Sequence, residues 1–140
     1  MKSYSYDEIQ IGQKESVTKT ITEYDIYAYA GVTGDFNPAH VDAVYAETGF
    51  FKERIAHGML IASFISTILG MYLPGPGSII MSNRVDFLMP VRFNDTITAT
   101  CEVIEKLEKG NVKLKSEVTN QDGKLVMTGE SLVKIPRQKI

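Results

Sequence analysis

Residues 56–73 read AHGMLIASFISTILGMYL, and this stretch decides the fold. It has no charged side chain after His57 and is apolar on nearly every face of a helix. A helix that is hydrophobic all round must be buried inside protein. The stretch is too short, and too interrupted by serine and threonine, for a membrane span, which needs about 20 mostly apolar residues. We therefore expect a long central helix, ended by Pro74 and Gly75, with protein around it.

The few small or polar residues of this helix share one side. They recur at spacings of three and four residues, at Ser63, Ser66, Thr67 and Gly70, and such spacings place side chains on the same face. We expect this narrow stripe to meet a polar group or a closely approaching neighbour.

The rest of the chain is predicted to supply strands and two short helices. Residues 22–31 begin with the capping pattern of Thr22 and Asp25, and residues 42–48 begin at Asp42 and end at Gly49. Between them, Pro38 disfavours helical geometry at the residue before it, so residues 33–40 are expected to form an ordered turn. Alternating or β-rich patterns predict strands over residues 13–20, 78–89, 96–107, 112–119 and 124–135, with turns at 94–95, 109–111 and 121–123.

This order of elements predicts an α+β fold with an antiparallel sheet. A curved sheet wrapped around one long apolar helix is the hot-dog architecture, and the apolarity of residues 56–73 favours it. At 140 residues the chain is expected to be a single hot-dog domain, residues 1–140.

Composition narrows the class of protein. The net charge of −2 gives no general attraction to nucleic acid or to an anionic membrane. Residues 1–10 lack the apolar core of a signal peptide, and Cys101 is the only cysteine, so we expect a reducing, cytoplasmic location without an internal disulfide. One cysteine and two histidines at these spacings make no zinc cluster unless carboxylates join them.

Asp35 and His40 are the first candidates for chemistry. On a helix their spacing would point them roughly 140° apart, so only the turn at Pro38 can make them converge. A carboxylate and an imidazole facing one water form a workable acid/base pair. The structural alternative is that Asp35 caps a turn and His40 packs beside the helix that follows.

Three further candidates lie on the central helix. The amide of Gly58, at the helix start, has no partner within the helix and could stabilise an oxyanion. Ser63 could contact a substrate, although a mid-helix serine usually bonds to the carbonyl four residues earlier. For His57 we favour a structural role, as a satisfied polar residue shielding the helix end.

Together these segments resemble the MaoC-like (R)-specific enoyl-CoA hydratases. The matching stretches are GDFNPAH (34–40), AHGMLIAS (56–63), LPGPGSI (73–79) and FLMPV (87–91), in the same order and spacing. The resemblance implies that Asp35 and His40 are the catalytic pair, that Asn37 holds their loop, that Ser63 lies near the thioester, and that the Gly58 amide binds the thioester carbonyl. It also implies a hot-dog homodimer with an acyl-CoA substrate.

The function expected from this resemblance is reversible addition of water to a trans-2-enoyl-CoA, giving the (R)-3-hydroxyacyl-CoA. No metal or organic cofactor is expected, because the thioester itself stabilises the developing charge and coenzyme A belongs to the substrate. A hot-dog thioesterase is the nearest alternative, but it typically carries a carboxylate on the central helix, and residues 56–73 contain none. A non-catalytic acyl-CoA-binding module and an interaction-only protein are the others, and neither needs both Asp35 and His40.

Overall fold

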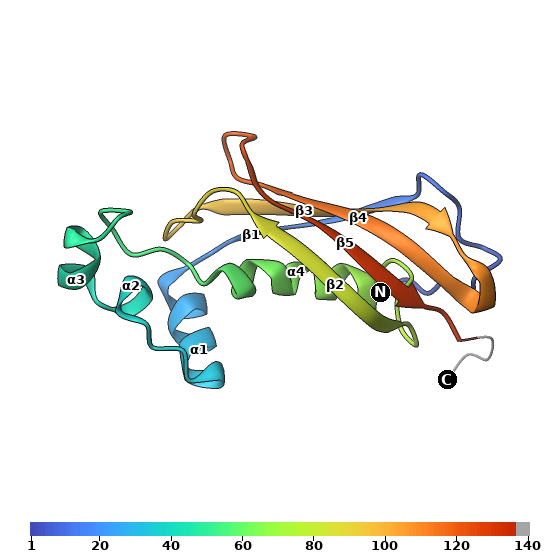
Figure 1. Ribbon diagram of the computed structural model, residues 1–140, viewed down its shortest axis with the longest axis horizontal. Coiled ribbons are helices and arrows are strands. Elements are labelled where there is room, and N and C mark those ends of the chain that lie inside the picture. Colours follow the sequence, from blue (N-terminus) through green and yellow to red (C-terminus); the bar gives the residue numbers. More distant parts are fainter. Residues whose placement is uncertain (137–140) are drawn as a thin grey trace.

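The computed structural model describes residues 1–136, in which a five-stranded antiparallel sheet curls around one long helix (Figure 1). This is the α+β arrangement expected from the sequence. In chain order the elements are β1 (Lys14–Thr20), α1 (Glu23–Thr33), α2 (Pro38–Val41), α3 (Ala43–Thr48), α4 (Gly58–Met71), β2 (Ile79–Phe87), β3 (Thr96–Lys106), a short 3₁₀ turn (Glu108–Gly110), β4 (Asn111–Thr119) and β5 (Leu125–Lys134).

The strands lie in the order β1-β3-β4-β5-β2, and every neighbouring pair is antiparallel. The last three strands form the meander that the sequence indicates. However, β2 does not pair with β3, which follows it in the chain; it pairs with β5, with Val85 opposite Gly129. As a result, β1 and β2 are the two edges of the sheet.

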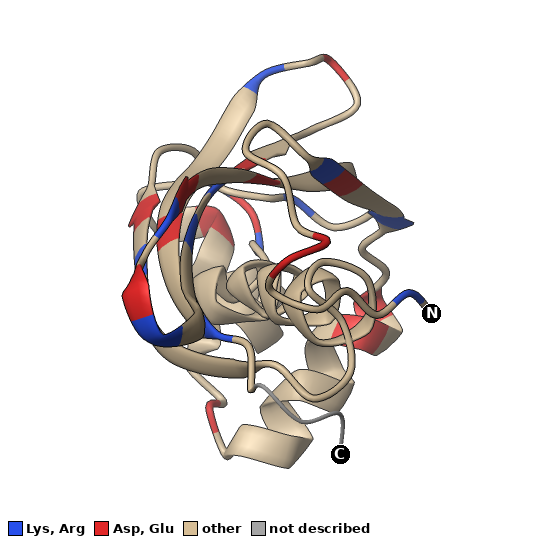
Figure 2. Cartoon of the chain, turned by 90° about the vertical axis from the view of Figure 1, so that its right-hand side faces the viewer, with Lys and Arg blue, Asp and Glu red and all other residues tan. Residues whose placement is uncertain are grey.

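The core lies between the sheet and one face of α4. Ile65, Ile68 and Leu69 are fully buried there, beneath buried strand residues such as Val103 and Leu114. The outer face of the sheet is polar; in β4, for example, Lys115 and Glu117 are exposed between buried neighbours. Figure 2 marks charged residues along the strands, whereas the helix within their curve carries none.

The expectation that α4 is wrapped on all sides is wrong for the single chain. Five strands curve over one side only, so the opposite side is exposed, including Met59, Ser63, Ser66, Thr67 and Met71. The predicted stripe of small and polar residues lies on this exposed side. The helix is also shorter than predicted, because His57 has extended backbone (φ −58°, ψ 129°) and the helix ends at Met71.

The short helices α1–α3 gather at one end of α4 (Figure 1). Thr22 and Asp25 form the predicted capping box, and α1 ends at Gly34, whose φ of 79° is left-handed. The ordered turn predicted over residues 33–40 is only partly correct, because its second half is α2. Pro38 does keep Asn37 out of the helix, but a proline is also favourable at a first helical position, so it starts a new helix.

None of the helices within residues 1–136 combines the length and apolarity needed to cross a membrane.

Candidate active site

The loop between α1 and α2 is held by successive hydrogen bonds from side chains to the backbone. Asp35 Oδ1 accepts the amide of Asn37 at 3.2 Å, and Asn37 Oδ1 accepts the amide of Ala39 at 3.0 Å. These bonds are the local turns that Asp and Asn favour, and the second caps α2. Asp35 and Asn37 therefore act locally as a turn former and a helix cap; the role of Asn37 in holding a catalytic loop stays a prediction.

His40 is anchored to the segment that leads into α4. Its Nδ1 lies 2.8 Å from the carbonyl oxygen of Ile55, and the Ile55 amide donates to the Ala39 carbonyl at 3.2 Å. A carbonyl oxygen can only accept, so the ring donates through Nδ1–H. This leaves Nε2 as the ring nitrogen that can exchange a proton.

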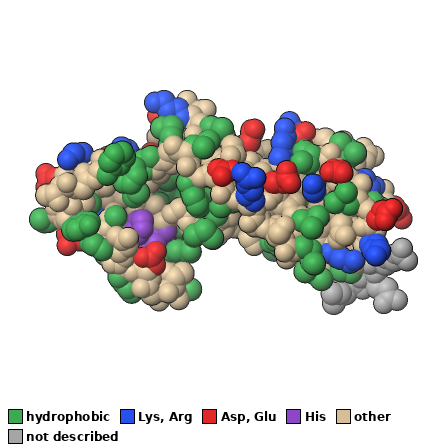
Figure 3. All heavy atoms as spheres, in the orientation of Figure 1, with side chains coloured by type: hydrophobic (Ala, Val, Ile, Leu, Met, Phe, Trp, Pro, Cys, Tyr) green, Lys and Arg blue, Asp and Glu red, His purple; other side chains and the backbone are tan. Residues whose placement is uncertain are grey.

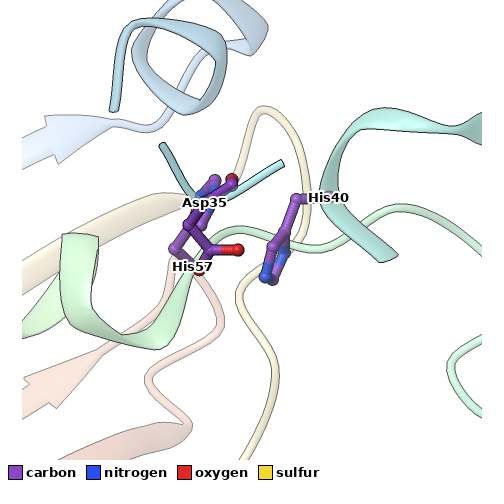
Figure 4. A group of neighbouring side chains, drawn as sticks. All are labelled: Asp35, His40 and His57. Atoms are coloured by element: carbon purple, nitrogen blue, oxygen red, sulfur yellow. The ribbon is translucent and has the colours of Figure 1, made fainter. Parts of the chain in front are cut away.

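His57 completes the cluster. Its Nε2 lies 2.9 Å from the backbone oxygen of Asp35, and its ring lies against that of His40, with centroids 3.9 Å apart and an angle of 30° between planes. One polar atom from each of Asp35, His40 and His57 lies within 4.8 Å of the others. The three side chains come from three separate segments (Figure 4). The turn at Pro38 thus brings Asp35 and His40 together as predicted.

The distance of less than 4.8 Å between Asp35 and His40 suits an acid/base pair. Two groups that each hydrogen-bond one water at about 2.8 Å can lie up to about 5 Å apart. Asp35 is exposed and His40 is half-buried, so solvent reaches both. In Figure 3 the histidine atoms reach the surface beside an acidic side chain, and apolar side chains surround them.

Asp35, His40 and His57 are also residue types that bind metal ions, and they lie close enough together for one ion to be considered. An ion must lie close to the plane of each imidazole that binds it. Two rings stacked 3.9 Å apart and tilted by only 30° have no common in-plane position near both. The arrangement therefore fits proton transfer better than metal binding.

A second set of contacts fixes α1 relative to this site. Arg54 forms an ion pair with Glu23 at 2.7 Å and donates to Tyr27 Oη at 2.9 Å, while Tyr27 donates to the Val41 carbonyl at 2.9 Å. The hydrogen bond to Glu23 raises the pKa of Arg54 above its usual value. These bonds join α1, α2 and the segment before α4, which are the three parts that carry the site.

An apolar pocket of about 350 Å³ lies beside the cluster. Its wall includes residues 55, 56 and 58, the segment that carries His57 and accepts the bond from His40; Asp35 and His40 themselves do not line it. The amides of Gly58 and Met59 donate to no acceptor among residues 1–136. A Cβ on Gly58 would lie 2.9 Å from the ring of Phe87, so glycine lets this ring pack on the helix start.

Ser63 is placed differently. Its hydroxyl donates to the Met59 carbonyl at 2.8 Å, within its own helix, and it is exposed on the side of α4 away from the sheet. Within one chain it does not line the pocket beside Gly58. Its predicted position near a thioester stays a prediction.

His57 is the residue that sequence reasoning undervalued. It is indeed a buried polar residue before α4, 2% exposed, but it makes no capping hydrogen bond to that helix. Its contacts are instead to both members of the predicted pair. The available signal was its place one residue before Gly58, at the start of the apolar stretch.

A curved antiparallel sheet around one helix defines a hot-dog protein, and the carboxylate and imidazole near the start of that helix are its candidate acid/base site. The model of the MaoC-like domain matches residues 7–125. The chain is 48% identical to the (R)-specific enoyl-CoA hydratase of Rhodospirillum rubrum, over 94% of this chain and 91% of that protein. It is 39% identical to the (R)-specific enoyl-CoA hydratase of Aeromonas caviae, over 94% and 99%. Its fold matches the unliganded R-hydratase PhaJ1 of Pseudomonas aeruginosa with a TM-score of 0.91 and 44% identity, covering 97% of this chain and 88% of that one. The chain belongs to the MaoC-like family.

Proposed function

We propose that this protein is an (R)-specific enoyl-CoA hydratase, a hydro-lyase that adds water reversibly to a trans-2-enoyl-CoA. The observation that carries the proposal is the convergence of Asp35 and His40 in a chain 48% identical to an enzyme of that name. The apolar pocket beside Gly58 is suited to the acyl part of such a substrate.

In the proposed reaction, one water lies between Asp35 and His40. Asp35 removes a proton as the water oxygen bonds to C3 of the enoyl group. His40 begins the step as the imidazolium, with hydrogens on both ring nitrogens, delivers the Nε2 proton to C2 and becomes neutral. The Gly58 amide donates to the thioester oxygen, which carries negative charge in the transition state. The proton on Asp35 then returns to His40, directly or through solvent, and restores the pair. In the dehydration direction the same steps run backwards.

Charge delocalisation into the thioester supplies the electron sink, so this mechanism uses no metal ion or organic cofactor. The acyl-CoA is the partner molecule, and nucleic acid and membrane have no role in it. We assign the enzyme to the cytoplasm because its single cysteine is buried and unpaired, which suits a reducing compartment.

We also propose that the working unit is a homodimer. Strand β2 is an edge of the sheet, and exposed apolar side chains follow it and the residues after it: Ile79, Ile80, Met81, Phe87, Leu88 and Met89. Met59 and Met71 add to this surface from the exposed side of α4. An unpaired strand edge and apolar surface of this kind favour pairing with a second copy across a two-fold axis.

The test is a steady-state assay of the purified protein with enoyl-CoAs from four carbons upward. We expect loss of the conjugated enoyl thioester and formation of a product that an (R)-specific 3-hydroxyacyl-CoA dehydrogenase oxidises. Asp35→Asn is the matched control. Release of free CoA thiol without hydration would instead identify a thioesterase, and binding without turnover would identify an acyl-CoA-binding module.

A further inference from the structure

His57 is buried just before α4, and its side chain forms a hydrogen bond with the loop that carries Asp35. It is 2% exposed, and its Nε2 is 2.9 Å from the Asp35 backbone oxygen. Because that oxygen can only accept, Nε2 carries the hydrogen. The bond ties the start of α4 to the residue proposed as the base, across 22 positions of sequence.

The ring of His57 also supports His40. The centroids of the two rings are 3.9 Å apart, and the ring of Tyr29 in α1 has its centroid 4.9 Å from that of His57, at a tilt of 55°. His40 is therefore fixed in two ways, by the bond from Nδ1 to the Ile55 carbonyl and by the ring of His57 against its face. A ring held in this way keeps Nε2 in one direction.

The remaining nitrogen of His57 takes no part in this network. Nδ1 is buried and has no hydrogen-bond partner within residues 1–136. A proton added there would find no acceptor, so the Nε2–H tautomer is the one that the contacts favour. His57 is thus poorly placed to exchange protons with water, and well placed to hold its two neighbours.

We propose that His57 is a positioning residue for the hydration reaction: it fixes the Asp35 backbone and the His40 ring so that both reactive atoms face one water. This inference rests on the proposed function. Misplacement of a reacting group by about 1 Å can cost about 10²-fold in rate, so loss of His57 should lower kcat with little effect on KM.

Two isosteric amides provide the test. In His57→Gln the side-chain amide can reach the position of Nε2 and donate to Asp35; in His57→Asn it ends near the position of Nδ1 and cannot. We expect His57→Asn to lower kcat by about 10–100-fold with KM changed less than about threefold, and His57→Gln to recover at least about fivefold of that loss. If His57→Asn does not fold, His57→Phe, which keeps the ring without the donor, takes its place.

A double-mutant cycle separates positioning from general damage. In a background that carries both Asp35→Asn and His40→Ala, neither member of the pair is left to position, so His57→Asn should lower the residual rate by less than about threefold. Ile26→Val is the control for destabilisation, because it removes one methyl group from a fully buried residue of α1 and should leave kcat unchanged.

The inference fails if folded His57→Asn keeps wild-type kcat, if His57→Gln is no better than His57→Asn, or if the loss multiplies fully onto the variant that lacks both Asp35 and His40. These results are distinct from failure of the proposed function, in which the wild-type protein itself does not hydrate enoyl-CoA.

Discussion

Asp35 has a structural role in its loop, and we propose a chemical role for the same carboxylate. Oδ1 accepts the Asn37 amide and so shapes the loop, and one carboxylate oxygen lies within 4.8 Å of a ring nitrogen of each histidine. An asparagine at this position still offers Oδ1 to the Asn37 amide, but it cannot take a proton from water. The structural and chemical roles of the residue are therefore separable.

Asp35→Asn and His40→Ala are each expected to lower kcat by roughly 10²–10⁴-fold, the usual contribution of a positioned acid or base. His40→Asn separates the structural contact of His40 from its chemistry. The asparagine amide can donate to the Ile55 carbonyl in place of Nδ1–H, but the variant has no group at the position of Nε2. Circular dichroism should show folded variants. Hydration of crotonyl-CoA at near wild-type rate by either variant would refute the assignment.

Ser63→Ala is expected to weaken turnover less than the changes at Asp35 or His40. The hydroxyl is bonded to the carbonyl of Met59 in its own helix, so its removal takes away a hydrogen bond and no proton carrier. Steady-state kinetics of the three variants under one set of conditions decide this. A loss in folded Ser63→Ala as severe as that of Asp35→Asn would give Ser63 a direct chemical role.

Cys101 should be inert in the folded protein. It is fully buried in β3, and burial raises the pKa of its thiol from 9.0 to about 12. A thiol reacts as the thiolate, so at pH 8 a disulfide reagent should modify Cys101 only as the chain unfolds. Rapid stoichiometric labelling in buffer, at the rate seen in denaturant, would contradict the burial.

At the level of elements, α1 is held by the capping box at its first turn. The Thr22 hydroxyl accepts the Asp25 amide, and an Asp25 oxygen accepts the Thr22 amide at 2.8 Å. Desolvation raises the pKa of Asp25, but hydrogen bonds from Lys19 and Thr22 outweigh it, and the net shift is downward. The cap matters for the site because α1 carries Tyr29 and leads directly into the loop of Asp35.

Thr22→Ala is expected to lower the free energy of unfolding by about 1 kcal/mol, the usual cost of losing a threonine cap. Urea denaturation measures this directly. Val32→Ala on the same helix is the control, because this side chain is 87% exposed and its loss should change stability by less than about 0.5 kcal/mol. Equal effects of the two substitutions would mean that the cap contributes nothing measurable.

For the whole molecule, the two edges of the sheet differ in character. The outer face of β1 carries hydroxyl pairs with β3, such as Thr18 with Thr98 at 2.8 Å, whereas β2 exposes Met81 and its apolar neighbours. Polar groups can remain in water at little cost, and exposed apolar side chains gain by burial. The β2 edge is therefore the one that we expect a second copy to cover.

Light scattering coupled to size exclusion should give a mass of twice 15.6 kDa for the active protein. Met81→Lys should weaken the dimer and reduce activity with it, because a buried unpaired charge at an interface is costly. Thr18→Lys, on the opposite edge, should leave both unchanged. An active sample with a mass near that of one chain would overturn the dimer proposal.

The sequence by itself predicted most of the elements and, through the family resemblance, the proposed catalytic pair. The all-round apolarity of residues 56–73, the capping signals at Thr22 and Asp42, and the change to strand patterns after Pro74 are local, so they can be interpreted without knowing the fold. The convergence of Asp35 and His40 was also predictable, because Pro38 lies between them and restricts the backbone of its neighbour.

Only the tertiary structure decided where His57, Ser63 and β2 lie. The contacts of His57 with Asp35 and His40 join residues far apart in sequence, and a buried histidine before a helix has the same pattern whatever it contacts. Ser63 lies on the exposed side of α4 because the sheet covers only the other side, and β2 pairs with β5 although β3 follows it in the chain. Periodicity fixes which faces of an element are apolar, but the partner of each face depends on how the whole chain packs.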